Sequence, residues 1–249
     1  MARKLRRRAW RTRSGACLAE GPSVIVEALR SPHDVTDLFV TSDAPAELAV
    51  DARRHGARVH EVGPAVLRSL TDTVTSQGAV AVVSVGTASI TRLGSPDLVL
   101  VLAEVRDPGN AGTLTRSALA AGASAAVFVT GTVDPFGPKT IRSSAGAIFR
   151  LPIVTSVALD EALEGLRAAG LRLVGTRAGA ERSLYEADLR AAVAIVVGNE
   201  AWGLPDGAGE LVDEVVSIPM RGPVDSINAG IAGSVMLFEA ARQRAEVGR

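Results

Sequence analysis

The sequence predicts an α/β fold in which a parallel sheet is covered by helices on both faces. From residue 97 onward, apolar runs of strand length alternate with segments that have the period of amphipathic helices. Glycine-containing loops with polar side chains follow two of these runs, at 194–197 and 215–218. Because ligands of open α/β sheets bind at the carboxyl ends of the strands, we expect the functional site at that edge.

The first third of the chain predicts a separate, small α/β unit. Its periodicity indicates helices at 23–29, 44–55 and 65–70 and strands at 35–40, 57–62 and 79–85. Residues 86–96 have no sustained pattern and contain Gly, Ser and Pro, so we place the linker there, with domains at 1–88 and 97–249 and a linker at 89–96. In the larger domain we expect a last helix over 228–244 and strands at 98–103, 125–129, 149–154, 172–176, 192–197 and 215–218.

Composition narrows the class of protein. Hydrophobic residues make up 47% of the 249 residues and charged residues 22%, which is typical of a soluble globular protein. The single cysteine, Cys17, excludes an internal disulfide and favours a reducing, cytoplasmic location. With 3 histidines and no cluster of Cys and His, no metal site is expected. No apolar run has the length that a membrane span needs, so no membrane partner is expected.

Charge is unevenly placed along a chain whose net charge is +0. Residues 1–13 are strongly basic, and no acidic residue occurs before Glu20. A solvated basic arm favours phosphate contacts, with Arg11 and Arg13 as candidate RNA-binding residues. A disordered, solubilising tail explains the same charge equally well.

Three segments of the larger domain place polar residues directly after predicted strands. They are Asn110-x-Gly112-x-x-x-Arg116, Gly198-Asn199-Glu200-x-x-Gly203-Leu204 and Ile218-Pro219-Met220-x-Gly222-x-x-x-Ser226-Ile227-Asn228. The last two are close in sequence, so their loops can close over one ligand from both sides. The chain contains neither G-x-G-x-x-G nor G-x-x-x-x-G-K-[ST], which argues against a dinucleotide enzyme and a P-loop NTPase.

In this order and spacing, the three segments resemble the motifs of the SpoU/TrmH branch of the SPOUT RNA methyltransferases. Those motifs are N-x-G-x-x-x-R, G-x-E-x-x-G-L and I-P-M-x-G-x-x-x-S-L-N, and the one departure is Ile227 in place of leucine. The resemblance covers residues 98 to about 244. It implies an S-adenosylmethionine-dependent ribose 2′-O-methyltransferase, a deep trefoil knot in the C-terminal domain and an active site completed at a homodimer interface. The small and apolar faces of residues 230–238 suit that interface, with the N-terminal domains held outward.

The resemblance also implies roles for individual residues. Arg116 is expected on the first or second turn of its helix, facing the loop of Asn110, where it orients an RNA phosphate or accepts the hydroxyl proton. The expected catalytic set is Arg116, Asn110, Glu200, Ser226 and Asn228. The expected cofactor-binding set is Thr176, Gly198, Asn199, Glu200, Gly203, Ile218, Met220, Ile227 and Asn228.

Simpler explanations remain open for several of these residues. Glu200 can be a carboxylate favoured at a helix start, and Ser226 can cap the last helix. Ile218 and Ile227 can be core residues while their backbone contacts a cofactor.

The RNA partner is also inferred from resemblance. Residues 13–21 and 73–81 resemble segments of an L30e-like substrate-binding domain, and Lys139 and Arg142 match a K-x-x-R-x-S-x-G stretch expected to shape the RNA cleft together with Arg116. An appended L30e-like domain favours rRNA, most of all 23S rRNA, over tRNA. The alternatives are a tRNA 2′-O-methyltransferase and a non-catalytic RNA-binding or ribosome-assembly factor on the same scaffold.

Overall fold

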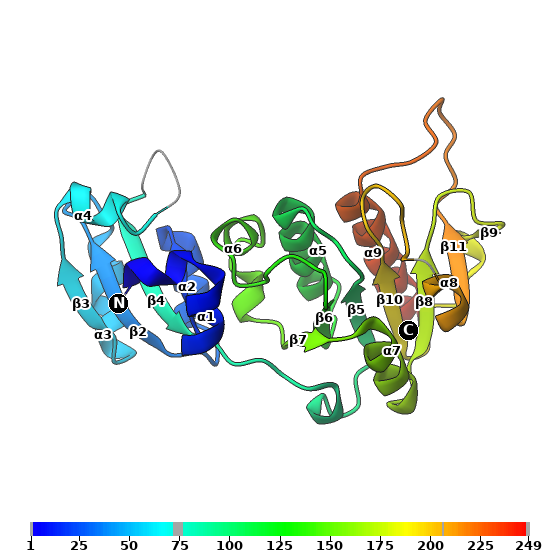
Figure 1. Cartoon of the computed structure of the whole chain (residues 1–249), viewed down its shortest axis with the longest axis horizontal. Helices are drawn as coiled ribbons and strands as arrows, with labels where there is room; N and C mark the ends of the chain where they lie inside the picture. Colours follow the sequence, from blue (N-terminus) through cyan, green and yellow to red (C-terminus); the bar gives the residue numbers. More distant parts are fainter. Residues whose placement is uncertain (1, 72–76, 206, 248–249) are drawn as a thin grey trace. The chain divides into compact units, whose positions relative to one another are not determined.

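The chain divides into two compact units (Figure 1). In the computed structural model, residues 2–71, 77–205 and 207–247 are described. The first unit comprises Met1–Gly86 and Asp134–Arg150, and the second comprises Thr87–Val133 and Leu151–Arg249. The sequence-based division at residues 89–96 therefore differs from the structure at one segment, because residues 134–150 pack with the first unit and not with the second. Of the resembling segment 73–81, residues 73–76 lie outside the described residues.

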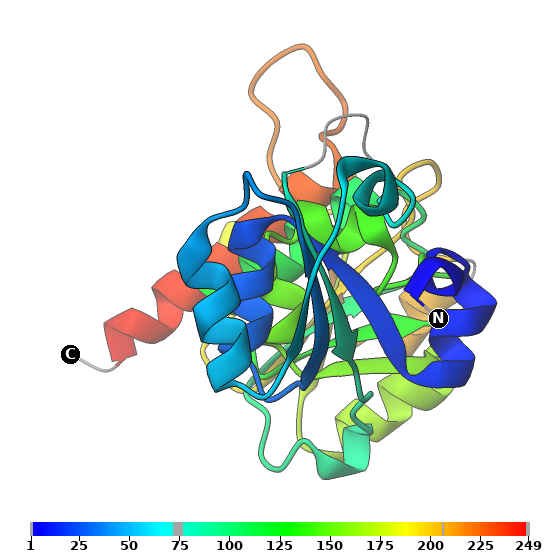
Figure 2. The ribbon, with the colours of Figure 1, turned by 90° about the vertical axis from the view of Figure 1, so that its left-hand side faces the viewer.

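The first unit is built on a four-stranded sheet with helices on both faces (Figure 2). Strand β4 (Ala79–Ser84) pairs antiparallel with β1 (Ala16–Glu20) and with β2 (Val35–Val40), and β2 pairs parallel with β3 (Arg58–Glu61). Helices α2 (Pro22–Leu29) and α3 (Ala46–Arg54) pack on the strands, with α4 (Pro64–Arg68), α6 (Pro138–Ser143) and the 3-10 turn η3 (Ala147–Phe149) completing the unit. Proline at the first helical position favours the starts of α2, α4 and α6.

The basic N-terminal segment is folded, so the interpretation of it as a disordered tail is wrong, while the phosphate contacts of its exposed arginines stay a prediction. It forms the 3-10 helix η1 (Ala2–Arg6) and helix α1 (Arg8–Ser14). Leu5 is only 1% exposed and packs in a cluster with Leu18 and Leu67, which ties η1 to the sheet. The basic residues around Leu5 dominate the pattern of this segment, so the sequence did not indicate that Leu5 is buried.

The second unit contains a seven-stranded parallel sheet in the order β7-β6-β5-β10-β8-β11-β9. Three of its inner strands, β5, β6 and β10, are buried along their whole length, as expected for a sheet covered on both faces. Its strands are β5 (Leu98–Leu102), β6 (Ala125–Val129), β7 (Ile153–Val157), β8 (Arg172–Thr176), β9 (Arg182–Ser183), β10 (Val193–Val197) and β11 (Glu214–Ser217).

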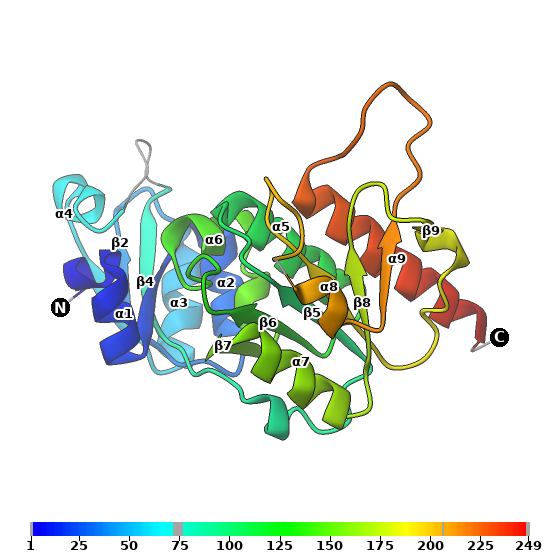
Figure 3. The same ribbon diagram turned by 45° about the vertical axis from the view of Figure 1, so that its right-hand side comes forward.

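Two long helices, α5 (Pro108–Ala120) and α9 (Ala229–Val247), pack against each other in the second unit (Figure 3). Their close approach depends on small residues of α9. A Cβ on Gly233 would lie 2.4 Å from a methyl carbon of Leu114 and 2.7 Å from one of Val197, so a larger residue there would require these side chains to shift. Helix α7 (Leu159–Ala168) packs through Leu163 and Leu166 in a separate core cluster. The remaining elements are α8 (Ala208–Leu211), η2 (Ile90–Arg92) and η4 (Leu184–Glu186).

Most predicted elements are confirmed within two residues, and the differences have local causes. The predicted strand at 149–154 is wrong at its start, because Phe149 is buried in the first unit as part of η3 and β7 begins only at Ile153. Strand β1 escaped prediction, since its short run Ala-Cys-Leu-Ala-Glu has no distinctive period. Among the described residues, no helix is both long enough and apolar enough to cross a membrane.

Candidate cofactor and catalytic site

Four loops leave the carboxyl ends of neighbouring strands in the second unit. They follow β5, β10, β8 and β11, which are adjacent in that order in the sheet. Because all these strands are parallel, the loops at residues 103–107, 198–205, 177–181 and 218–228 emerge at one edge. This is the edge at which the sequence predicts the functional site.

The carboxylate of Glu200 joins the loop after β10 to the loop after β5. It accepts hydrogen bonds from the backbone N–H groups of Arg106 (3.2 Å) and Asp107 (3.0 Å) and from the side-chain amide of Asn110 (3.0 Å). Partial burial acts to raise the pKa of Glu200, but these hydrogen bonds outweigh it and hold the pKa below its ordinary value. Glu200 therefore stays ionised and acts as a shared acceptor for the start of helix α5.

Asn199 fixes the shape of the same loop. Its Nδ2 donates to the carbonyl oxygen of Glu104 at 2.8 Å, and its Oδ1 accepts from the N–H of Ala201 at 2.8 Å. Its backbone also exchanges two hydrogen bonds with Gly203, of 2.7 and 3.0 Å. A Cβ on Gly198 would lie 2.2 Å from the backbone of Gly203, so this tight turn requires glycine.

A small cavity of about 60 Å³ lies at the carboxyl ends of β8 and β11. Five residues of the predicted sites line it together: Thr176, Ile218, Met220, Ser226 and Ile227. Arg177, Ala178, Asp225 and Ala232 complete the lining. Side chains of Thr176 and Ile227, 51 positions apart in the sequence, thus line one cavity. Gly198, Asn199, Glu200 and Gly203 lie in the neighbouring loop and not in this lining.

The two motif asparagines approach each other across Gly230. A Cβ on Gly230 would lie 3.0 Å from Oδ1 of Asn228 and 3.1 Å from Oδ1 of Asn110. Oδ1 of Asn228 accepts the N–H of Ile231 at 3.2 Å, so Asn228 caps helix α9. The alternative that Ser226 caps the last helix is wrong, because α9 begins at Ala229, two residues too late for Ser226.

Arg116 does not lie where the sequence places it. It is the ninth residue of α5 and falls on the third turn, not on the first or second. Six residues of helix place its side chain about 120° around the helix from that of Asn110, so the two do not share one face of α5. Arg116 is exposed, and within residues 2–71, 77–205 and 207–247 its side chain makes no hydrogen bond or ion pair.

The expected RNA-binding residues Arg11, Arg13, Lys139 and Arg142 all belong to the first unit. Arg11 is 8% exposed; its guanidinium donates to Asp134 (2.6 and 2.9 Å) and to the carbonyl oxygens of Leu5 and Arg6. It is thus not available to a phosphate, which corrects the sequence-based assignment. Arg13 and Lys139 are exposed, and Arg142 pairs with Glu20 at 3.3 Å.

Sequence reasoning missed residues that position the site. Asp107 caps helix α5 by accepting the N–H of Asn110 at 2.8 Å, and the pair Asp107-Pro108 is a recognisable helix start. The sequence places Gly230 and Gly233 among the small residues of a dimer interface, whereas in the structure both lie against residues of helix α5. Within the described part of the chain, no group of three or more His, Cys, Asp or Glu could hold a metal ion.

Fold and site together define an α/β protein in which polar loops gather at the carboxyl edge of a parallel sheet. The family model described as "SpoU rRNA Methylase family" matches residues 97–238, and the "MRM3-like substrate binding domain" matches residues 1–81. The chain therefore belongs to the SpoU rRNA methylase family, as the motifs predict. The predicted enzyme class, an RNA 2′-O-methyltransferase, and its cofactor, S-adenosylmethionine, are confirmed with it.

Curated relatives and solved structures agree with this placement. The chain is 30% identical to the Bacillus subtilis "23S rRNA (guanosine(2553)-2'-O)-methyltransferase RlmP", covering 95% of this chain and 92% of the relative. It is 36% identical to the "23S rRNA (guanosine-2'-O-)-methyltransferase RlmB" of Xanthomonas axonopodis pv. citri, over 80% and 83% of the two chains. The structure of the SpoU methyltransferase AviRb from Streptomyces viridochromogenes with AdoMet superposes with a TM-score of 0.87 at 31% identity, covering 98% and 97%.

Proposed function

We propose that this chain transfers the methyl group of S-adenosylmethionine to a ribose 2′-hydroxyl of 23S rRNA. The observation that carries the proposal is the cavity at the ends of β8 and β11, in which residues of the predicted cofactor set converge. The choice of 23S rRNA is supported by the names of the two curated relatives.

The residues around the cavity suit an adenosine. Ile218, Met220 and Ile227 supply apolar surface, and Thr176 supplies a hydroxyl beside backbone groups at the strand ends. S-adenosylmethionine, when bound, supplies an activated methyl group. Transfer would join the ribose oxygen to the methyl carbon and leave the electron pair of the broken carbon–sulfur bond on sulfur. The hydroxyl proton would pass to the RNA phosphate beside Arg116 or to water.

We assign Arg116 to the RNA side of the reaction. An exposed guanidinium with no protein partner among the described residues can pair with a phosphate and hold the adjacent ribose in line. Glu200, Asn110 and Asn228 act by holding the loops in register, since each bonds to a helix start or to the neighbouring loop. Ser226 lines the cavity and contacts the cofactor there.

The same enzyme is proposed to be a homodimer that joins through helix α9. Ile231 and Phe238 are 54% and 50% exposed, and with Val235 they form one face of α9 beside Tyr185, which is 61% exposed. Thr113 borders this apolar face, one turn before Arg116 on helix α5. A partner seated on the face would therefore lie beside Arg116, which supports an active site completed by two subunits.

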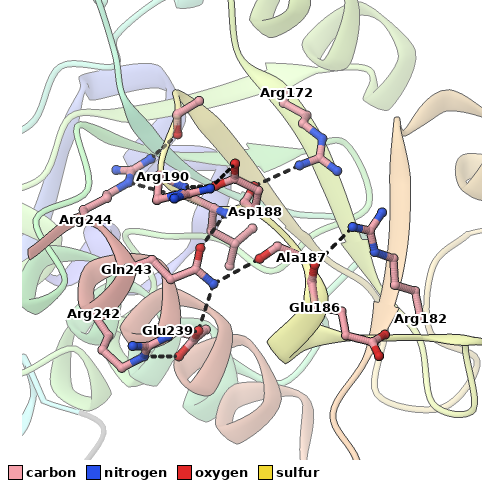
Figure 4. A network of polar contacts seen from close by, with 12 residues as sticks. Arg172, Arg182, Glu186, Ala187, Asp188, Arg190, Glu239, Arg242, Gln243 and Arg244 are labelled. Carbon is pink, nitrogen blue, oxygen red and sulfur yellow. Dashed lines mark hydrogen bonds and ion pairs between the residues drawn. The ribbon is translucent and has the colours of Figure 1, made fainter. Parts of the chain in front are cut away.

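The deep trefoil knot is proposed from the way helix α9 is enclosed. Gln243 accepts the N–H of Leu189 at 2.8 Å and donates to the carbonyl oxygen of Ala187 at 3.0 Å (Figure 4). Arg244 donates to the carbonyl oxygens of Leu189, Ala191 and Asp97. The helix is held by α5 and β10 and by the 187–191 segment, as a threaded helix would be.

For the first unit we propose an L30e-like, RNA-binding domain that delivers rRNA to the catalytic unit, in a cytoplasmic enzyme. The match to a substrate binding domain over residues 1–81 supports this role. Arg13 and Lys139 are its exposed basic candidates for phosphate contacts, and Arg142 is half-buried beside Glu20.

Three measurements test the proposal. Titration calorimetry should show saturable binding of S-adenosylmethionine. Labelled S-adenosylmethionine should methylate deproteinised 23S rRNA, and mapping should place the label on one ribose. Equilibrium sedimentation should give a dimer that Phe238→Asp converts to a monomer. Absence of saturable binding of S-adenosylmethionine, together with no transfer to rRNA or tRNA, would instead support a non-catalytic RNA-binding factor.

A further inference from the structure

Two exposed side chains stack on each other at the carboxyl edge of the second unit. The guanidinium carbon of Arg106 lies 4.9 Å from the centroid of the Trp202 indole. Trp202 is 53% exposed, and the side chain of Arg106 is 62% exposed. They come from different loops, Arg106 from the loop after β5 and Trp202 from the loop after β10. Neither side chain has a role in the assignments above.

The two loops hold this pair rigidly. Glu200 binds the backbone N–H of Arg106, and Asn199 binds the carbonyl oxygen of Glu104. The N–H of Glu104 donates to Oγ1 of Thr132 at 3.1 Å. Glu104 has φ = 61°, a left-handed backbone that a non-glycine residue adopts only when its surroundings impose it. The backbone beneath Arg106 is therefore fixed by contacts from two other segments of the chain, the loop after β10 and the segment of Thr132.

Chemistry of the pair favours a flat, aromatic ligand over a phosphate. Arg106 is already paired with the carboxylate of Glu104 at 3.4 Å, and the ionised Glu200 lies beneath its backbone. These acids weaken the attraction for another anion but leave the planar faces of guanidinium and indole available. Across residues 2–71, 77–205 and 207–247, Arg106 is the only cation or ring that lies over the Trp202 ring. Nucleobases stack on such surfaces whatever their sequence.

We propose that Arg106 and Trp202 form a platform on which one unpaired base of the RNA substrate stacks during methyl transfer. The inference rests on the proposed function, because the platform lies at the same strand edge as the cofactor cavity. Stacking a base there would hold one nucleotide near the reacting ribose. The platform would make no hydrogen bonds to the edge of that base, so it would not distinguish one base from another. The platform would therefore contribute RNA affinity and positioning, and leave the choice of target to other contacts.

Fluorescence tests the contact directly, because the chain has 2 tryptophans and Trp10→Phe leaves Trp202 as the only indole. We expect single-stranded oligouridylate to quench Trp202 emission. A base-free ribose-phosphate oligomer of equal length should bind the basic surfaces without quenching. Equal quenching by both oligomers, or quenching by neither, would overturn the platform.

Substitutions measure the contribution to RNA affinity. Loss of one stacked base predicts that Trp202→Leu, which keeps an apolar side chain but removes the ring, weakens RNA binding about 5- to 150-fold. Trp202→Phe should recover part of this loss, and Arg106→Gln should weaken binding less than Trp202→Leu. The affinity for S-adenosylmethionine should not change. Leu211→Ala and Arg190→Gln, an exposed apolar residue and an exposed ion-paired arginine elsewhere in the unit, are matched controls.

The outcomes separate this inference from the proposed function. If wild-type protein methylates rRNA and Trp202→Leu keeps wild-type RNA affinity and KM, the platform is refuted while the methyltransferase stands. If Trp202→Leu only lowers thermal stability, the stack merely braces two loops and the inference is wrong. A loss of cofactor affinity in Arg106→Gln equal to that in Asn228→Ala would place Arg106 at the cofactor instead, and would also refute it.

Discussion

Glu200 accepts a hydrogen bond from the side-chain amide of Asn110 at 3.0 Å, across 90 positions of sequence. This bond joins the second sequence motif to the first, and Gly230 then brings the third motif against Asn110. The first two motifs are thus coupled by a contact between their own residues, and the third is coupled to them through Gly230, two residues beyond its end. Variants that break one of these contacts report on how the cofactor site is held together.

Stability should depend on pH through Glu200, whose pKa is lowered in the folded chain by hydrogen bonds that outweigh its partial burial. A lowered folded pKa means that the ionised carboxylate stabilises the fold at pH values above the ordinary 4.5. This contribution is lost as the pH falls through the lower, folded pKa. Glu200→Gln should therefore be less stable than wild type at pH 7, and the difference should shrink on acidification.

The free energies of unfolding of wild type and Glu200→Gln, measured with denaturant at several pH values from 7 to 3, check this prediction. Glu210→Gln, at an exposed carboxylate on helix α8, is the matched control and should keep a nearly constant offset from wild type. A Glu200→Gln difference that grew as the pH fell would contradict the assignment.

Arg116→Ala should leave the affinity for S-adenosylmethionine unchanged, because Arg116 lies on the exposed face of α5 and outside the cavity lining. Removing one charge-stabilising group raises a barrier by about 2.7–4 kcal/mol, so turnover should fall roughly 100- to 1000-fold. Calorimetry and single-turnover methylation measure the two effects separately. Arg190→Ala serves as control, and near-normal turnover of Arg116→Ala would remove Arg116 from the mechanism.

Asn228→Ala should weaken both the fold and cofactor binding, because it removes the cap of helix α9 beside the cavity. Loss of a cap predicts a decrease of about 1 kcal/mol in the free energy of unfolding. Asn228→Asp keeps a capping oxygen and should recover the stability, so any remaining loss of affinity reports on the amide itself. Ser226→Ala should not change stability, and a loss comparable to that of Asn228→Ala would show that Ser226 also supports the helix.

Arg11 and Arg13 should behave differently although both belong to the basic segment. Arg11→Ala leaves Asp134 without its buried partner and should lower the free energy of unfolding by about 3 kcal/mol.

Arg13→Ala should keep wild-type stability and reduce the slope of log affinity for RNA against log salt by about 1. Point variants are preferable to deleting residues 3–13, since the deletion would also remove the buried Leu5. An unchanged salt slope for Arg13→Ala would exclude its phosphate contact.

Local pattern was enough to predict most of the elements. Buried strands such as β6 and β8 appear in the sequence as short apolar runs with clear ends, and the three motifs mark the loops that follow strands. The convergence of Thr176, Ile218 and Ile227 was implied by the family resemblance of the motifs, and it fits a parallel sheet, whose strands bring their carboxyl ends to one edge.

Local pattern failed where contacts come from distant segments. Phe149 looks like the start of a strand, but its burial in the first unit makes it part of a 3-10 turn. The predicted position of Arg116 on its helix was wrong because the helix begins at Pro108, two residues before the motif. A shift of a few residues in the start of a helix moves a given side chain to a later turn.

The sequence by itself determined the family, the strand and loop pattern and the residues that meet at the cofactor cavity, because these depend on periods and motifs within a few residues. Only the tertiary structure decided that Arg11 is buried against Asp134, that Asn228 and not Ser226 caps helix α9, and that Arg106 stacks on Trp202. Two of these contacts join residues far apart in the sequence, and the third depends on where the chain turns into its last helix. The geometry of these three contacts is set by how whole helices, strands and loops pack together, and a pattern within a few residues does not contain that information.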